Sequence, residues 1–273
     1  MDKLTGKQTL PTKEDELQHG QLARIFISIA VVALNWEPFG IGSLILRPLT
    51  YIYTFVHEMG HGVAAILVGG TFDKFELNLD GSGMATSHFP ASNLCQAFVA
   101  FGGLVAPAIW AAICLMIGRS AKASRIGFCI FAALMIPSLV LVIKAFSIFG
   151  IVFVSLLGVA CVTIAKFSVV KDASGKIIKE RKYPQYLMLL VAITLCTNVF
   201  TRGDYLFTDV ATGAIATPGQ PLPPSDVGQI EQALFLPYWF WGGLISLISV
   251  AVLGIGIWAF FKPSKSKTKA IEA

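Results

Sequence analysis

Long apolar runs constrain the fold of this chain more than any other feature of its sequence. There are about seven of them, separated by short polar stretches, and most reach the length of roughly 18–20 residues that crosses a bilayer as a helix. They cover about 25–46, 50–68, 94–118, 125–143, 146–166, 184–200 and 235–261. Only 14% of the residues are charged, whereas soluble domains carry about 25%. The sequence therefore predicts an all-α, polytopic transmembrane helix bundle with about six or seven spans.

The chain divides by composition into a polar N-terminal segment, one membrane domain and a basic tail. Residues 1–20 are polar and mixed in charge. They do not resemble a cleavable signal peptide, so we expect the first apolar run to stay in the mature protein. The membrane domain covers 21–261, with a hairpin or loop at 70–91 and a polar loop at 201–234. Residues 262–273 form the basic C-terminal tail.

Lysine and arginine gather in the loops at 119–125 and 166–183 and in the C-terminal tail. Such residues favour the cytoplasmic side of a membrane, and the three regions alternate consistently if all of them are cytoplasmic. The 201–234 loop then lies on the outer side, while the side of the N-terminus stays open. The net charge of +5 thus reflects membrane orientation. We expect no nucleic-acid partner, because a solvated basic groove with interleaved aromatic residues is absent.

Residues 70–91 have a different sequence pattern from the apolar runs. Phe75-Glu76-Leu77-Asn78-Leu79 alternates apolar and polar residues, Asp80-Gly81 suits a turn, and Gly83-Met84-Ala85-Thr86 can return as a second strand. This pattern predicts a short β-hairpin, with an irregular loop as the alternative. The free edge of such a hairpin can pair with an extended peptide by strand addition. Further along, we expect a short helix to start at Ser225, with a Ser or Asp cap.

One apolar run carries the sequence His57-Glu58-Met59-Gly60-His61. On a helix, histidines four residues apart project from one face, one turn apart, which suits two ligands of a tetrahedral zinc. Glu58 is offset by about 100°, close enough to take a proton from a zinc-bound water without ligating the metal. Zinc lowers the pKa of that water from about 15.7 towards 7. Glu58 can then act as general base and pass the proton to a leaving amine.

Two observations favour a functional interpretation of this motif. The chain has only 4 histidines, so a chance occurrence has a probability on the order of a few in a thousand. A glutamate at the centre of a membrane helix costs roughly 2.5 kcal/mol or more, and such residues usually face a polar cavity. The alternative is a structural polar cluster between helices, formed by the same three side chains.

The motif and its surroundings resemble a known family. The stretch from Thr54 to Ala65, followed by Gly69-Gly70 and Gly81-Ser82-Gly83, is similar to the signature of the site-2 protease superfamily of intramembrane zinc metallopeptidases. The closest similarity is to its site-2-protease-B-like branch of bacteria and plants. The Gly/Ala/Pro-rich stretch 101–108 and the stretch 225–230 are similar to later elements of that branch.

The resemblance implies a zinc-dependent metalloendopeptidase that cleaves membrane-embedded or membrane-proximal polypeptides in or near the bilayer. We accordingly expect an integral multi-pass protein of the bacterial inner membrane, with lipid and a membrane protein or peptide substrate as its partners. The small residues of 100–112 predict that this segment packs on the motif helix, because small residues let membrane helices approach closely.

The resemblance also implies a third zinc ligand, an aspartate from a later segment. The chain departs from the family here, because the usual Leu-Asp-Gly after an Asn-x-x-Pro element is absent. Asn198 precedes Asp204 in a stretch that is loosely similar to these two elements. Asp204 is therefore the first candidate, Asp226 the alternative, and Asp209 a third. Each aspartate can instead simply solvate an outer loop. Asn198 is a candidate for binding the unwound substrate or the oxyanion, although a polar helix end explains it as well.

Two other classes of protein share parts of this pattern. A membrane scaffold or chaperone can keep the fold and the metal without turnover, and the missing Leu-Asp-Gly is consistent with that class. A transporter or ion pathway can use intramembrane histidine and glutamate as relay groups. Metal content and the effect of replacing Glu58 distinguish these classes.

Overall fold

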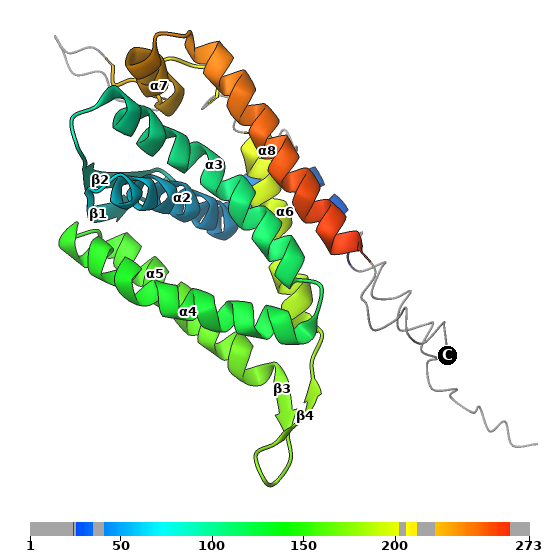
Figure 1. Ribbon diagram of the computed structural model, residues 1–273. Helices are drawn as coiled ribbons and strands as arrows, with labels where there is room; N and C mark the ends of the chain where they lie inside the picture. Colours follow the sequence, from blue (N-terminus) through cyan, green and yellow to red (C-terminus); the bar gives the residue numbers. More distant parts are fainter. Residues whose placement is uncertain (1–23, 25, 35–40, 202–205, 212–221, 263–273) are drawn as a thin grey trace, which may run out of the picture.

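The computed structural model describes residues 24, 26–34, 41–201, 206–211 and 222–262, and structural statements below concern these residues. Residues 26–34 are helical. The elements that follow are α2 (Ile41–Leu67), β1 (Thr71–Leu77), β2 (Gly83–His88), α3 (Asn93–Ile117), α4 (Ala121–Lys144), α5 (Ile148–Phe167), β3 (Val169–Lys171), β4 (Ile177–Glu180), α6 (Tyr183–Thr201), α7 (Asp226–Leu234) and α8 (Tyr238–Phe261). Figure 1 shows long helices with two small hairpins at opposite ends of the α4–α5 pair.

The predicted helical membrane bundle is confirmed, although the count of spans is lower than expected. Among the described residues, 5 helices are long and apolar enough to cross a membrane, namely α3, α4, α5, α6 and α8. The motif helix α2 has 27 residues and is absent from this group, because its charged and histidine side chains lower its hydropathy.

The motif helix also begins earlier than the sequence suggested. We assigned residues 41–46 to the end of the first apolar run, but they form the first turns of α2, which continues through Pro48 to Leu67. A proline is tolerated inside membrane helices because neighbouring groups and local adjustments satisfy the freed backbone carbonyl. The polar and proline residues Glu37 and Pro38, which interrupt the first apolar run, lie outside the described residues.

Helix α3 lies at the centre of the bundle and contacts α2, α6, α7 and α8. In α3, 61% of the most apolar window is buried, against 44% in α6 and 22% in α8. Its contact with α2 is close, because a Cβ atom added at Gly60 would lie 2.5 Å from the Gly102 carbonyl oxygen. The prediction that the 100–112 segment packs on the motif helix is confirmed.

The predicted β-hairpin is present and is tied to α2. Strands β1 and β2 pair antiparallel, with Phe75 opposite Ala85. The Tyr51 hydroxyl donates to the Leu79 carbonyl at 2.7 Å, and the Thr54 hydroxyl donates to the Gly81 carbonyl at 2.7 Å. These bonds place the turn of the hairpin against the motif helix.

The turn of this hairpin is closed by its own side chains. The hydroxyl and the backbone N–H of Ser82 donate to the Asp80 carboxylate, and these bonds lower the pKa of Asp80. Gly81 has φ +93°, a conformation that glycine adopts without strain. The turn is therefore rigid where it meets α2.

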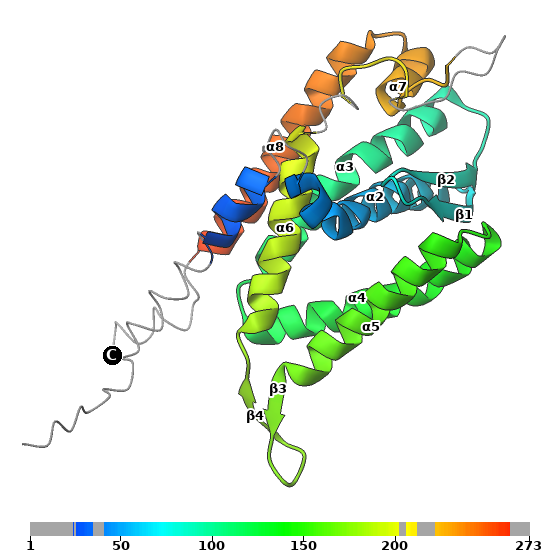
Figure 2. The same cartoon turned by 180° about the vertical axis from the view of Figure 1, so that it is seen from behind.

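Helices α4 and α5 form a pair that lies beside β1 and the lower half of α6, as both views show (Figures 1 and 2). The hydroxyl of Ser147 caps α5 by accepting from the Gly150 N–H at 3.2 Å and donates to the Leu77 carbonyl at 3.0 Å. This serine is therefore a polar link between the α4–α5 pair and the β1–β2 hairpin.

A second hairpin, β3–β4, follows α5, where the sequence suggested only a basic loop. Its turn is held by Asp172, whose carboxylate accepts from the backbone N–H groups of Ser174 and Lys176, and by Gly175 with φ +82°. The strands have 3 and 4 residues, too few for a recognisable alternation of polar and apolar residues.

Candidate metal centre

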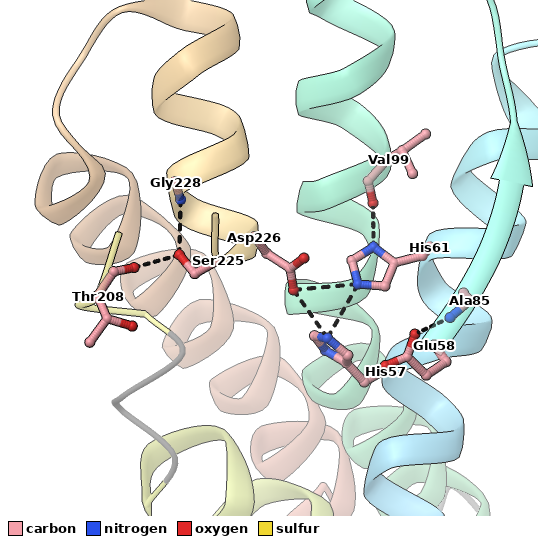
Figure 3. A network of polar contacts seen from close by, with 9 residues as sticks. All are labelled: His57, Glu58, His61, Ala85, Val99, Thr208, Ser225, Asp226 and Gly228. Atoms are coloured by element: carbon pink, nitrogen blue, oxygen red, sulfur yellow. Dashed lines mark hydrogen bonds and ion pairs between the residues drawn. The ribbon is translucent and has the colours of Figure 1, made fainter. Parts of the chain in front are cut away.

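His57 and His61 lie one turn apart on α2, and their imidazoles meet the carboxylate of Asp226 from α7 (Figure 3). The Nε2 atoms of the histidines are 3.2 Å apart. Asp226 Oδ2 lies 3.1 Å from Nε2 of His57 and 3.4 Å from Nε2 of His61. Ligand atoms about 2.0–2.2 Å from a tetrahedral zinc are roughly 3.3–3.6 Å apart. The three groups therefore have about the spacing of three corners of a zinc tetrahedron.

Asp226 reaches this position because the start of α7 is fixed. The hydroxyl of Ser225 accepts from the Gly228 N–H at 3.0 Å and donates to the Thr208 carbonyl. The Ser225 N–H donates to the Asp209 carbonyl at 2.9 Å. A Cβ atom at Gly228 would lie 2.3 Å from that same carbonyl oxygen, so this glycine allows close approach. The short helix predicted at Ser225 is present, with Ser225 as its cap.

The orientation of His61 is set by α3. Its Nδ1 lies 2.9 Å from the Val99 carbonyl, which only accepts, so Nδ1 carries the proton and Nε2 presents its lone pair to a metal. A Cβ atom at Gly103 would lie 2.2 Å from Nε2 of His61. Only glycine at this position leaves room for the ring. Neither contact was predicted from the sequence, although the Gly-Gly pair at 102–103 indicates close approach.

His57 is enclosed by aromatic rings and by the bundle. Its ring is stacked on that of Tyr53, with centroids 6.2 Å apart, and meets the His61 ring edge-on. His57 is 7% exposed and Glu58 is 8% exposed. The candidate site is therefore buried among helices.

Glu58 lies beside the two imidazoles and is not part of the ligand group. Its Oε2 accepts a hydrogen bond of 2.7 Å from the backbone N–H of Ala85 on β2 (Figure 3). A Cβ atom at Gly83 would lie 3.0 Å from Cγ of Glu58, so the hairpin backbone runs directly over this side chain. The hairpin therefore holds the Glu58 carboxylate, and its role as a proton acceptor stays a prediction.

The other candidate residues are distributed as follows. Asp204 lies outside the described residues. Asp209 contacts the start of α7 through its backbone carbonyl. Asn198 is buried in α6 and donates to the Thr194 carbonyl at 2.9 Å, and its role in substrate binding stays a prediction. His88 is exposed and pairs with Asp73 at the base of the hairpin.

Fold and site together define the class of this molecule as a polytopic membrane protein with a His–His–Asp group and an adjacent glutamate inside its helical bundle. A family model described as Peptidase M50B-like matches residues 25–256. The chain belongs to this Peptidase M50B-like family, and the resemblance to the site-2 proteases is confirmed. No curated protein and no solved structure gives a significant match. Family membership supports a membrane-associated function of the site-2 protease type.

Proposed function

We propose that the protein is an intramembrane zinc metalloendopeptidase that hydrolyses peptide bonds of membrane-embedded or membrane-proximal polypeptides. The observation that carries this proposal is the convergence of His57, His61 and Asp226 beside the Glu58 carboxylate. Two imidazoles and one carboxylate with an open fourth position are typical of catalytic zinc sites. When bound there, zinc supplies a Lewis acid that polarises the scissile carbonyl and acidifies a water molecule.

Glu58 is the proposed general base and general acid. In this proposal the Glu58 carboxylate, oriented by the Ala85 N–H, takes the proton from the attacking water. It then delivers the proton to the leaving amine, which completes the hydrolysis. The hydrogen bond to Ala85 holds the carboxylate in one orientation throughout.

The β1–β2 hairpin is the proposed guide for the substrate. The Ala85 N–H of β2 donates to Glu58, so a peptide that pairs with the neighbouring residues of this strand would lie beside the base. A peptide bond inside a helix is shielded from attack, and an extended conformation exposes it. Asn198, at the end of α6, is a candidate for binding the unwound segment.

Two substitutions test the proposal together. Glu58→Gln should keep the zinc and lower cleavage of a membrane substrate by about 10²–10⁴-fold, since the proton acceptor is lost. Asp226→Ala should lose both the zinc and the cleavage. Zinc is measured by mass spectrometry of the purified protein and cleavage by gel assay in proteoliposomes.

Two aspartates serve as controls for the third ligand. Asp209→Ala should retain zinc, because the described contact of Asp209 uses its backbone. If Asp204→Ala releases the metal and Asp226→Ala does not, the proposed ligand assignment is wrong. A Glu58→Gln variant that cleaves as fast as the native protein would refute Glu58 as the base. Native protein that holds zinc but cleaves no membrane substrate would instead favour a metal-binding scaffold.

A further inference from the structure

The groove between α4 and α5 has charged side chains at one end and mainly apolar side chains along the rest. A cavity of about 420 Å³ lies where α4 begins and α5 ends, against the β3–β4 hairpin. A second cavity of about 470 Å³ continues along the same two helices. Both cavities are lined by Ala132 and Val162, so they form one continuous groove. We propose that this groove binds an anionic glycerophospholipid. The proposal does not depend on the peptidase chemistry.

The first cavity presents cations to a ligand. Arg125 of α4, Lys166 of α5 and Lys171 of β3 line it. Arg125 pairs with the Glu180 carboxylate at 3.2 Å, so one of the three positive charges is partly offset. Arginine and lysine are the side chains that bind phosphate groups through charge-assisted hydrogen bonds. This end of the groove therefore suits a phosphodiester headgroup.

The second cavity suits an acyl chain. Its lining is free of charged side chains and consists of apolar residues with two hydroxyls, those of Ser155 and Thr163. Ala132 and Gly158 have small side chains or none, and they keep the groove open between the larger side chains. In the apolar windows of α4 and α5, only 28% and 22% of the residues are buried, so these helices present most of their surface to lipid.

The length of the groove matches one leaflet of a bilayer. From Arg125 to Leu139 the chain advances 139 − 125 = 14 residues along α4, which is roughly 21 Å at the helical rise. Half of a bilayer with its headgroups is about 20–22 Å thick. The cationic end lies at the face that the basic loops predict to be cytoplasmic, where anionic lipids concentrate. A free phosphate would fill only the first cavity.

Lipid retention tests the proposal on the full chain. The protein is purified in mild detergent, incubated with phosphatidylglycerol or phosphatidylcholine of identical acyl chains, and examined by native mass spectrometry. We expect phosphatidylglycerol to be retained at least tenfold more than phosphatidylcholine. Replacing Arg125, Lys166 and Lys171 by glutamine should remove this preference, with a loss of roughly tenfold or more in occupancy.

A matched variant separates the groove from general surface charge. Lys176→Gln, Lys179→Gln and Arg181→Gln remove three charges from the same loop, and these residues do not line either cavity. This control variant should retain as much phosphatidylglycerol as the native protein. Equal losses in the two triple variants, or equal retention of both lipids by the native chain, would overturn the proposal.

Two further readouts keep the test valid if the charge variant folds poorly. Ala132→Trp fills the junction of the cavities and should lower retention at least tenfold, whereas Ala133→Trp, on the exposed side of α4, should not. Phosphatidylglycerol should also protect Cys129, which lines the first cavity, from maleimide, with Cys95 as internal reference. If inorganic phosphate alone protects Cys129 equally, or if Ala132→Trp has no effect, a lipid is not the occupant.

Discussion

The region around α3 and the α4–α5 pair are built in different ways from similarly apolar sequences. In α3, 61% of the most apolar window is buried, and α2 approaches it at glycine positions. The corresponding windows of α4 and α5 are 28% and 22% buried, and Figure 2 shows the pair lying beside the rest of the bundle. Apolar burial does not drive helices together in lipid, so close packing depends on small residues. Helices α2 and α3 pack closely in this way, and α2 carries His57 and His61, which meet Asp226.

The largest expected effect lies at the glycine beside His61. Gly103→Ala places a methyl group 2.2 Å from Nε2 of His61, which pushes the ring away from Asp226. We expect zinc affinity to fall roughly a hundredfold, measured by competition with a chromogenic chelator. The control is Gly254→Ala in α8, where a Cβ atom would have no neighbour within 4 Å. Equal affinities in the two variants would contradict the close fit.

The next prediction concerns the free energy of unfolding. It compares a glycine at the contact of α2 with α3 and a glycine of the α4–α5 pair. Gly60→Ala brings a methyl group to 2.5 Å from the Gly102 carbonyl oxygen and should lower the free energy of unfolding by about 1–3 kcal/mol. Gly158→Ala on α5 meets Met135 at 3.3 Å, and this flexible side chain can move, so we expect less than about 1 kcal/mol. Denaturant titration in mixed micelles measures both. A larger loss at Gly158 would reverse the comparison.

A smaller effect concerns the hydrogen bond on Glu58. Ala85→Pro removes the N–H that donates to Oε2 of Glu58 at 2.7 Å. If this bond orients the base, kcat should fall roughly tenfold while zinc content stays unchanged, since a bond to a charged group contributes about 1.5–3 kcal/mol. In a Glu58→Gln background the proline should have little further effect. Additive losses in the double variant would show that Ala85 acts through the fold instead.

The smallest effect on the candidate metal site is expected at the link between the two regions. Ser147→Ala removes the cap of α5 and the hydrogen bond to the Leu77 carbonyl. We expect a loss of about 1 kcal/mol in the free energy of unfolding and no change in zinc affinity. Both are measured on the same preparation. A drop in zinc affinity would mean that the α4–α5 pair helps to position the metal group.

Features that depend on neighbouring residues in the sequence could be predicted, and those that depend on distant segments could not. His57, Glu58 and His61 are related by one turn of helix, so their spacing alone placed the imidazoles together. The alternation around Phe75 predicted the first hairpin in the same local way. Ser225 was identified as a cap because capping involves only the next few residues.

The carboxylate that meets the two imidazoles illustrates the limit. Asp204 was preferred to Asp226 from a loose family resemblance, since helical periodicity says nothing about which distant loop returns to a given helix. The structure brings Asp226 to both imidazoles. Likewise, the contact of Val99 with His61 joins two helices, and a carbonyl that orients a ring leaves no mark in the sequence.

The order of the chain also determines when the proposed enzyme becomes complete. Asp226 follows His61 by 226 − 61 = 165 residues, so a ribosome working at 5–20 residues per second needs roughly ten to thirty seconds to add it. During that interval the nascent protein has both imidazoles and the glutamate but not the Asp226 carboxylate. The proposed ligand group is therefore incomplete while most of the helices are still being inserted.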